Sequence, residues 1–159
     1  QSLMGLPWRV ALALQSDGWI LRSEVIWHKP HPFPEGNVTT RPHAAHEHVF
    51  LLAKRVGYHF ERAAAPFDVW SIPAETSRDA DAAPMPRALV RRCVMASTVP
   101  GDHVLDPFSG RGTVGLVAAE AGRFATLIDL DERAAAASRV YAAGGPLFAH
   151  GQTAGGEGS

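Results

Sequence analysis

Residues 103–143 alternate between short apolar runs and longer runs with helical spacing, and this order restricts the fold more than any other feature of the chain. The run "HVLD" predicts a short buried strand, "PFSGRG" a loop, "TVGLVAAEAG" a helix closed by Gly122, and "FATLIDL" a second strand. A second helix is predicted over "DERAAAASRVYAA", with Asp131 as its N-cap. Because strands that alternate with helices form a parallel sheet with helices on its faces, the sequence predicts an α/β fold.

A glycine pattern lies between the first strand and the first helix of this region. Gly110, Gly112 and Gly115 match G-x-G-x-x-G, and Asp129 ends the next strand, 19 positions after Gly110. A carboxylate at that place can accept both hydroxyls of a ribose. A tight strand-to-helix turn without a ligand is the plainer alternative, but it needs no acidic residue at the strand end. The pattern therefore favours a cofactor that contains adenosine.

Two cofactor classes fit the glycines and Asp129 equally well, namely a nicotinamide or flavin dinucleotide and S-adenosylmethionine. Asp106 and Pro107 distinguish them, because both precede the glycines at the strand's end. A pyrophosphate there requires backbone N–H donors, whereas Asp106 would repel it and Pro107 has no N–H. The ammonium and sulfonium of S-adenosylmethionine instead gain from a nearby carboxylate. The local chemistry favours the methyl donor.

The first half of the chain predicts a mixture of helix and strand. A helix is expected over residues 6–15 and a strand over residues 19–29, followed by a proline-rich loop over residues 29–42. The segments "EHVFLLAKR" and "YHF" flank Val56-Gly57, which predicts an antiparallel hairpin, and "FDVWSIP" predicts a short extended segment. The four tryptophans fall within these elements and are expected to be core residues rather than base-stacking platforms.

A polar linker over residues 74–84 separates this half from an amphipathic helix that opens at Pro86. Its apolar stripe and its basic outer side are expected to be Leu89, Val90, Cys93 and Val94, and Arg87, Arg91 and Arg92. Cys93 is the only cysteine, so it forms no internal disulfide, and its place on the stripe predicts core packing instead of a nucleophile.

Composition excludes several broad classes of protein. The chain of 159 residues is 46% hydrophobic and 19% charged, as in ordinary globular domains, and it contains no apolar run long enough to span a membrane. Its start lacks the basic region of a signal peptide, so a cytoplasmic location is expected. The formal charge of −1 excludes a uniformly basic surface, although DNA binding requires only a local one.

Two groups of polar residues are further candidates for sites. His43, His46 and His48 with Glu47 lack metal-ligand spacing and an obvious third ligand, so no metal is expected and a structural hydrogen-bonding role is favoured. The basic residues of the same half, which are candidates for phosphate contacts or ordinary solvated charges, are Lys29, Arg41, Lys54 and Arg55.

The segments "VLDPFSGRGTVGLVA" and "GRFATLIDLDERA" resemble the cofactor motifs of bacterial and phage amino-methyltransferases that act on adenine or cytosine in DNA. Arg111 stands where that family has a small residue, and Asp129 where it usually has Glu. The segment "AAPMPRALVRRCVMASTVPGDHVLDPF" resembles the family's A-x-M/F-P element, which packs beside the methionine end of the cofactor. "GLPWRVALALQSDGWILRSEVIWHKPHPFPE" and "RPHAAHEHVFLLAKRVGYHF" resemble the stretch after the catalytic motif in the subgroup ordered with catalysis first.

The resemblance implies a Rossmann-like S-adenosylmethionine-dependent methyltransferase fold with a mixed, mostly parallel sheet and a β-hairpin, present in part. It implies double-stranded DNA as the partner, with contacts from Lys29 and Arg41. The cofactor-binding residues that it implies are Met85, Pro86, Asp106, Pro107, Phe108, Ser109, Gly110, Gly112, Thr113 and Asp129.

The family's catalytic motif, S/D-P-P-Y/W/F, does not occur in this sequence, which has no two adjacent prolines. In the catalysis-first order the motif would precede residue 1, so the chain is expected to be the C-terminal part of such an enzyme, without a catalytic residue of its own. Residues 1–143 are expected to form the methyltransferase domain, and residues 144–159 a disordered tail. Within that domain, the resemblance implies part of the catalytic half over 1–73, a linker at the cofactor edge over 74–85 and the cofactor-binding half over 86–143.

The methylated base, adenine or cytosine, and the recognised DNA sequence stay open, within a restriction-modification or phage system. The alternative functions are a non-catalytic remnant of such an enzyme and a fragment of a nicotinamide-dependent oxidoreductase, the latter based on the glycine pattern alone.

Overall fold

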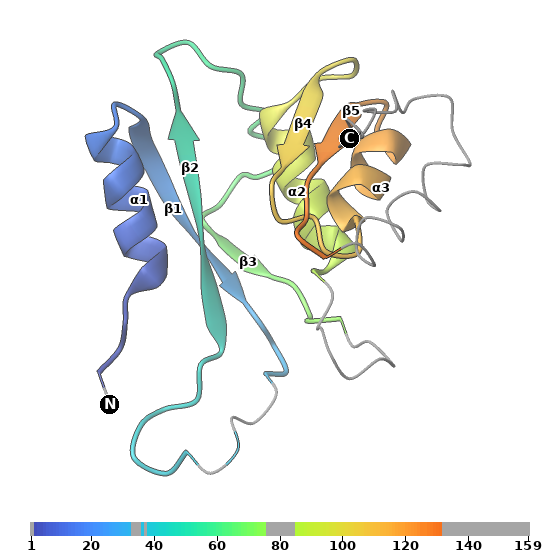
Figure 1. The fold of residues 1–159 in the computed structure, drawn as a ribbon. Helices are drawn as coiled ribbons and strands as arrows, with labels where there is room; N and C mark the ends of the chain where they lie inside the picture. The colour runs from blue at the N-terminus through green and yellow to red at the C-terminus, as the bar shows by residue number, and fades with distance from the viewer. Residues whose placement is uncertain (1, 33–35, 37, 76–84, 132–159) are drawn as a thin grey trace, which may run out of the picture. The chain divides into compact units, whose positions relative to one another are not determined.

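A computed structural model describes residues 2–32, 36, 38–75 and 85–131 of the chain. The elements, in chain order, are α1 (Leu6–Ser16), β1 (Ile20–His28), β2 (His46–Ala53), β3 (Val69–Ser71), α2 (Arg87–Ser97), β4 (His103–Asp106), α3 (Thr113–Glu120) and β5 (Phe124–Leu127) (Figure 1). They form two compact units, Gln1–Thr98 and Val99–Ser159. The predicted second helix after Asp131, the tail and most of the linker lie outside the described residues.

The first unit is built on a three-stranded mixed sheet in the order β2-β1-β3. β1 pairs antiparallel with β2 and parallel with β3, and the ladder with β2 shifts register between Leu21 and Ser23. The helix and strands predicted over residues 6–15, 19–29 and "FDVWSIP" are confirmed by α1, β1 and β3. In the region that the structure describes, no helix is long and apolar enough to cross a membrane.

The predicted hairpin between "EHVFLLAKR" and "YHF" is wrong. All 8 residues of β2 pair with β1, and residues 58–60 lie outside any strand. A three-residue segment offers far fewer main-chain hydrogen bonds than β1, which matches β2 along its whole length, so the longer ladder prevails. Tyr58 instead accepts a hydrogen bond through its hydroxyl from Arg22 Nε, at 2.9 Å.

The two helices of the first unit cover opposite faces of its sheet. On one face, Trp27 and Trp70 form a buried cluster with Leu89 and Ala96 of α2. On the other face, Trp8 of α1 packs edge-to-face against Phe50, with ring centroids 4.8 Å apart. This arrangement follows from the strand period of two, because paired residues on neighbouring strands share a face.

The core follows the predicted pattern with one exception. Trp27 and Trp70 are 7% and 4% exposed, and the stripe of α2 is buried at Leu89, Val90 and Val94. Trp8 differs from the prediction because it remains 39% exposed. It lies at the margin of the contact between α1 and the sheet, so it covers Phe50 with one side and faces outward with the other.

The second unit contains the parallel pair β4-β5, with α3 joining the two strands. The α/β order predicted from the sequence is thereby confirmed. The prediction that "HVLD" is buried is wrong, because the side chain of Leu105 lies on a face of the pair that is 62% exposed at this residue. In the described part of this unit, α3 supplies the only helix packed on the two strands, so one face of the pair has no cover.

Candidate cofactor-binding site

The predicted glycine loop occupies residues 107–112, between the carboxyl end of β4 and the start of α3. β4 and β5 run parallel, and the N–H of Ile128 donates to the carbonyl of Asp106 at 2.9 Å. Asp106 and Asp129 therefore reach the same edge of the strand pair. In open α/β sheets, ligands bind at the carboxyl edge of the strands.

Gly110 and Gly112 turn the chain from the strand into the helix. Their φ angles are +48° and +79°, in the left-handed region that disfavours residues with a Cβ atom. The N–H of Gly112 donates to the carbonyl of Ser109 at 2.8 Å, and Gly112 is the N-cap of α3. These two glycines are thus required by the backbone of the loop, as the pattern predicts.

Gly115 meets a different requirement, the close approach of α3 to β5. A Cβ atom at this position would lie 2.6 Å from Leu127 Cδ1 and 3.3 Å from Leu127 Cγ. Those distances are shorter than van der Waals contact, so only glycine fits the present position of the leucine. The third glycine of the pattern therefore sets how closely the helix packs on the strand.

Asp129 binds the loop from the neighbouring strand end. Its Oδ2 accepts the N–H of Gly110 at 2.7 Å, and its Oδ1 accepts the N–H of Asp131 at 2.9 Å. These main-chain hydrogen bonds, from Asp131 first and Gly110 second, hold the pKa of Asp129 below its ordinary value. Each carboxylate oxygen keeps a second acceptor position, which leaves acceptors for ligand hydroxyls.

A further cross-link joins the same two segments, because the N–H of Ser109 donates to the carbonyl of Ile128 at 2.9 Å. Ser109 is 7% exposed, so this bond lies in the interior. The sequence pattern predicts Gly110, Ser109 and Asp129 as separate contributors to a site. It misses that they hold one another, because no local pattern reports a contact across 19 positions.

The other predicted loop residues surround this cross-linked centre. Asp106 is half-buried, and its Oδ1 accepts the N–H of Phe108 at 3.1 Å. Pro107 is exposed, Phe108 is 88% exposed, and Thr113 is the first residue of α3. Arg111, the residue that departs from the family's small one, is exposed and leaves the loop geometry intact. The loop thus presents an acidic side chain and an exposed aromatic ring beside the glycines.

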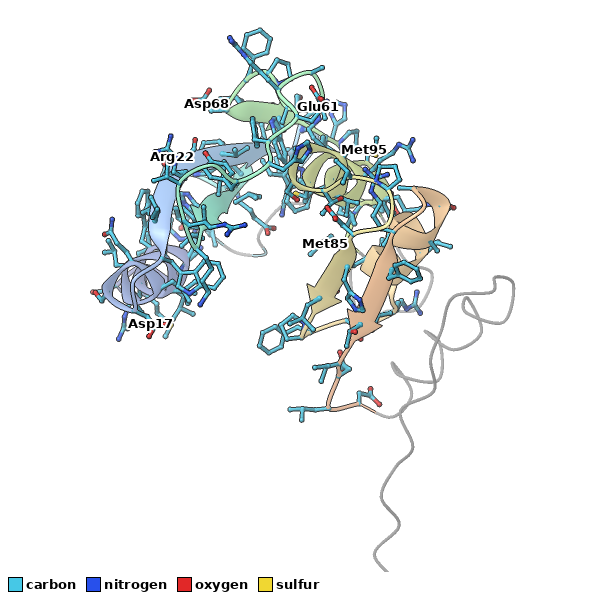
Figure 2. All side chains as sticks on the ribbon, turned by 90° about the horizontal axis from the view of Figure 1, so that it is seen from above. Asp17, Arg22, Glu61, Asp68, Met85 and Met95 are labelled. Atoms are coloured by element: carbon cyan, nitrogen blue, oxygen red, sulfur yellow. The ribbon has the colours of Figure 1, made fainter. Side chains whose placement is uncertain are left out.

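Met85 and Pro86 belong to the first unit, where they precede α2; Figure 2 labels Met85. Pro86 is the N-cap of that helix, and its carbonyl accepts the N–H groups of Leu89 and Val90 at 3.0 and 3.2 Å. Pro86 is fully buried, whereas Met85 is 53% exposed. Pro86 thus has a structural role at the helix start, and Met85 keeps an accessible thioether.

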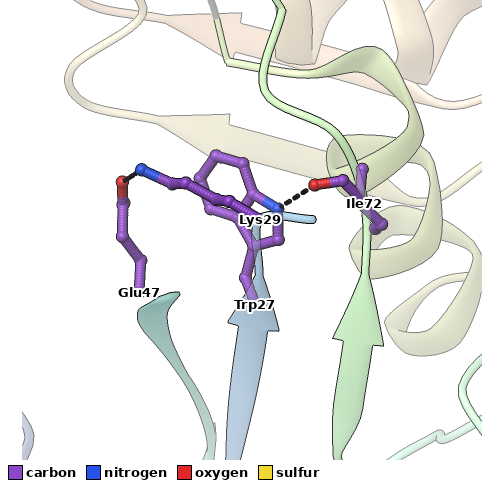
Figure 3. Close-up of polar contacts among 4 residues, drawn as sticks. All are labelled: Trp27, Lys29, Glu47 and Ile72. Carbon is purple, nitrogen blue, oxygen red and sulfur yellow. Dashed lines mark hydrogen bonds and ion pairs between the residues drawn. The ribbon is translucent and has the colours of Figure 1, made fainter. Parts of the chain in front are cut away.

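The predicted DNA contacts, Lys29 and Arg41, lie at the two ends of the loop between β1 and β2. The ammonium of Lys29 forms an ion pair with Glu47 and lies 4.8 Å from the centroid of the Trp27 ring (Figure 3). Trp27 is fixed in turn, since its Nε1 donates to the carbonyl of Ile72 at 2.8 Å. Lys29 therefore closes the base of the loop, while Arg41 is exposed and donates to the carbonyl of Pro42 at 3.2 Å.

The histidines of β2 form a contact that the sequence pattern did not reveal. His48 Nδ1 lies 2.5 Å from Glu24 Oε1 on the paired strand, and its ring stacks on Phe50. Both partners are about one-third exposed. Within the described residues, no group of three or more His, Cys, Asp or Glu side chains is arranged to hold a metal ion.

The fold and the loop together define a class, an α/β protein with an adenosine-cofactor site at the carboxyl edge of a parallel strand pair. Positive φ at two glycines, a tight third glycine and a carboxylate at the next strand end fit an adenosine. Asp106, beside a proline that has no N–H, fits a cationic ligand better than a pyrophosphate.

The chain belongs to the N6/N4 methyltransferase family, described as DNA methylase, whose model matches residues 2–139. This confirms the family and fold class that the sequence predicts. It also decides between the two cofactor classes in favour of S-adenosyl-L-methionine, and it removes the basis for a nicotinamide-dependent oxidoreductase.

Three curated relatives are type II methyltransferases. M.XycI of Xanthomonas campestris pv. cyanopsidis is 43% identical over 142 residues, and M.Cfr9I of Citrobacter freundii is 41% identical over 142 residues. Each match covers 82% of this chain and 47% of the relative. M.SmaI of Serratia marcescens is 41% identical over 152 residues, 87% of this chain and 52% of the relative. The chain thus spans about half the length of these relatives.

Two solved structures share the fold. TTHA0409 of Thermus thermophilus, a DNA modification methylase crystallised with S-adenosyl-L-methionine, has a TM-score of 0.65 and 29% identity over 90% of this chain and 61% of its own. The cytosine-N4-specific PvuII DNA methyltransferase has a TM-score of 0.75 and 22% identity, and the match covers 85% of this chain and 56% of that one.

Proposed function

We propose that this chain is the S-adenosylmethionine-binding part of a DNA methyltransferase that methylates an exocyclic amino nitrogen of adenine or cytosine. The enzyme would belong to a restriction-modification or phage system and act in the cytoplasm, where the target DNA lies. Its recognised DNA sequence is not encoded in any motif of this chain. Double-stranded DNA is the proposed partner, and the type II methyltransferase relatives support that choice.

The contact between Asp129 and Gly110 carries the proposal. It joins the carboxylate proposed to accept the ribose hydroxyls to the loop proposed to surround the ligand, at 2.7 Å. One charged side chain thereby fixes the loop and keeps acceptors for the ligand. The arrangement is preorganised, because the loop conformation needs no ligand to form.

The residues of the loop would divide the binding of the cofactor among them. Asp129 would accept the ribose hydroxyls, Gly110 and Gly112 would allow close approach of the backbone, and Asp106 would face the cationic part. Phe108 offers an exposed ring for packing, and Ser109, Thr113, Pro107, Met85 and Pro86 complete the proposed site. These roles concern binding and orientation alone.

S-adenosylmethionine supplies a methyl group on a sulfonium, which an amino nitrogen can attack directly. The transfer forms an N–C bond, breaks the S–C bond and releases a proton from the nitrogen, so no covalent enzyme intermediate is needed. Access to the amino group requires that the base leave the duplex, at a cost of a few kcal/mol. Holding and orienting the donor is the contribution of this chain, because aligned reactants gain several kcal/mol over free ones.

Calorimetric titration of the chain tests the proposal directly. We expect binding of S-adenosylmethionine and of its demethylated product, and no binding of NAD at the same concentrations. Binding of NAD without binding of S-adenosylmethionine would refute the assignment. Gly112→Val, which places a β-branched residue at a φ of +79°, should abolish binding, whereas Gln15→Glu on α1 should leave it unchanged.

A second candidate is a non-catalytic subunit that holds the cofactor without taking part in transfer. It is favoured by one observation, the absence of S/D-P-P-Y/W/F from the sequence. The two proposals differ in one experiment, in which radioactive methyl transfer to duplex DNA is measured after the missing half of the fold is supplied. Transfer supports the enzyme, and cofactor binding without transfer supports the non-catalytic subunit.

A further inference from the structure

Helix α1 carries an apolar stripe on the side that faces away from its own sheet. Leu6 and Val10, one helical turn apart, are 51% and 57% exposed, and Leu3 and Met4 before the helix are 98% and 66% exposed. The inner side is already occupied, since Ala11 is 1% exposed and Trp8 packs on Phe50. Figure 2 looks along α1, whose end is marked by Asp17, and shows one side of the helix turned outward from the strands.

An outer stripe of this kind is unusual for a helix at the surface of a finished domain. Surface helices carry polar residues on the side opposite the core, and a helix that is apolar on both sides is normally buried. A contiguous exposed apolar patch marks an interaction surface. The outer side of α1 therefore lacks a cover within the described part of the chain.

Strand β1 of the same unit has an open edge. All of β1 is engaged by β2 on one side, but on the other side β3 pairs with Ile26–His28 alone. In the described residues, no strand pairs with residues 20–25 on that side. Ser23 Oγ donates to the carbonyl of Glu24 at 3.1 Å, a local contact of the kind found where a neighbouring strand is missing. An open strand edge can accept a further strand.

We propose that the outer stripe of α1 and the open edge of β1 bind the polypeptide that carries the rest of the methyltransferase fold. The relatives identify this occupant, because the chain matches 47% of the Xanthomonas and Citrobacter proteins. The matches to the two solved structures likewise cover 61% and 56% of those chains, so a large part of each has no counterpart here. That remainder must cover apolar surface of the matched part to form one domain.

The proposal rests on the proposed function, because only a methyltransferase requires the catalytic motif from the remainder of the fold. It adds a place of attachment. A second copy of this chain is the competing occupant of the same surface, and the experiment below separates the two by composition of the complex.

The test uses the full chain of 159 residues and, as the probe, the part of the Xanthomonas relative outside the matched region. The relative's own matched part, produced separately, is the positive control. We expect a one-to-one complex in size-exclusion chromatography with light scattering. Hydrogen exchange should slow in residues 6–13 and 20–25, and the complex should transfer methyl groups to DNA.

The paired variant Leu6→Glu/Val10→Glu should weaken the complex at least tenfold, because it places two carboxylates in the apolar contact. The matched variant Arg9→Gln/Gln15→Glu changes the charge by the same amount at exposed positions of α1 off the stripe, and it should bind normally. Circular dichroism and S-adenosylmethionine affinity should be unchanged in both variants, since the mutated side chains are exposed and belong to the other unit.

Three results would overturn the inference. They are a complex without exchange protection at these residues, a complex insensitive to the paired variant, and no complex from a chain that still binds S-adenosylmethionine. Self-association of this chain with protection of residues 6–13 would assign the surface to a second copy. Loss of S-adenosylmethionine binding by the unmodified chain would instead refute the proposed function, so the two failures are distinguishable.

Discussion

At the scale of single residues, Asp129 combines a structural and a functional role. Its two oxygens accept main-chain N–H groups from Gly110 and Asp131, so the charge is already engaged without a ligand. The same charge would face the ribose hydroxyls in the proposed complex. A change at this residue therefore affects the shape of the loop and the affinity for the cofactor together.

We predict that Asp129→Asn weakens S-adenosylmethionine binding about tenfold or more. The amide retains one acceptor oxygen but presents an NH₂ to one of the two donors, and a hydrogen bond to a charged group contributes about 1.5–3 kcal/mol. Isothermal titration calorimetry measures the change. Asp131→Asn, which removes a charge two residues away and keeps the main-chain N–H, is the control and should bind almost normally. Equal losses in both variants would contradict a specific role of Asp129.

The hydrogen bonds to Asp129 also fix the sign of its pH dependence. They lower its pKa in the folded chain below the ordinary value of 3.8, so their contribution to stability is fully present above pH 3.8. It is lost as the pH falls through the lower folded-state pKa. The carboxyl carbon resonance of Asp129 in an NMR titration should show a midpoint below 3.8. A midpoint above that value would refute the observed contacts.

Cys93 has the opposite behaviour. Burial raises the pKa of its thiol to about 11, against smaller lowering effects of a main-chain hydrogen bond and Arg92. Because the folded-state pKa lies above the ordinary 9.0, the stability that this thiol contributes is complete below pH 9.0 and is lost as the pH rises toward 11. We predict slow alkylation at about pH 8 in the native chain and fast alkylation after unfolding. Rapid native alkylation would indicate a reactive thiol.

At the scale of elements, the contact between α3 and β5 sets the geometry of the loop. Gly115 lets the helix lie directly on Leu127, and the glycine loop begins at the strand beside it. Any group that separates the helix from the strand moves the N-terminus of α3, where Gly112 and Thr113 lie. Packing and ligand binding are thus coupled through one small residue.

We predict that Gly115→Val lowers the free energy of unfolding by about 2 kcal/mol, because overpacking of an interior costs about 1–3 kcal/mol. The better helix propensity of valine offsets only a few tenths of a kcal/mol of this loss. Urea denaturation measures it. The double variant Gly115→Val/Leu127→Ala should lose less than the sum of the two single variants, since the alanine removes the atoms that the new side chain meets. Strict additivity would show that the contact does not matter.

At the scale of the whole molecule, the chain consists of two compact units, and the glycine loop belongs to the second. A ligand that binds a folded site stabilises the folded state by mass action, about 2.7 kcal/mol at a hundredfold excess over the dissociation constant. The effect is largest for the segments that contact the ligand. The distribution of protection therefore identifies the binding segments.

We predict that S-adenosylmethionine slows hydrogen exchange most strongly in residues 106–113 and 129–131. Strand β2 of the first unit serves as an internal control and should change little. Protection that is confined to the first unit would contradict the site. Protection near Met85 in addition to the loop would support the proposed contribution of the segment before α2.

Much of the local structure was predictable from sequence. The bounds of α1 and α2, the strand-loop-helix-strand order of residues 103–127 and the positions of the glycines follow from periodicity, caps and turn residues, which act over a few positions. The resemblance to amino-methyltransferases added the family and the cofactor, and the matching family model confirms both.

The tertiary structure decided everything that depends on competition between distant segments. β2 pairs with β1 and not with residues 58–60, because the longer ladder forms more hydrogen bonds. Leu105 is exposed in an apolar strand because burial depends on what packs against a face, and Asp129 reaches Gly110 because two strand ends meet at one edge. Local patterns determine which elements form, whereas long-range hydrogen bonding and packing determine which elements meet.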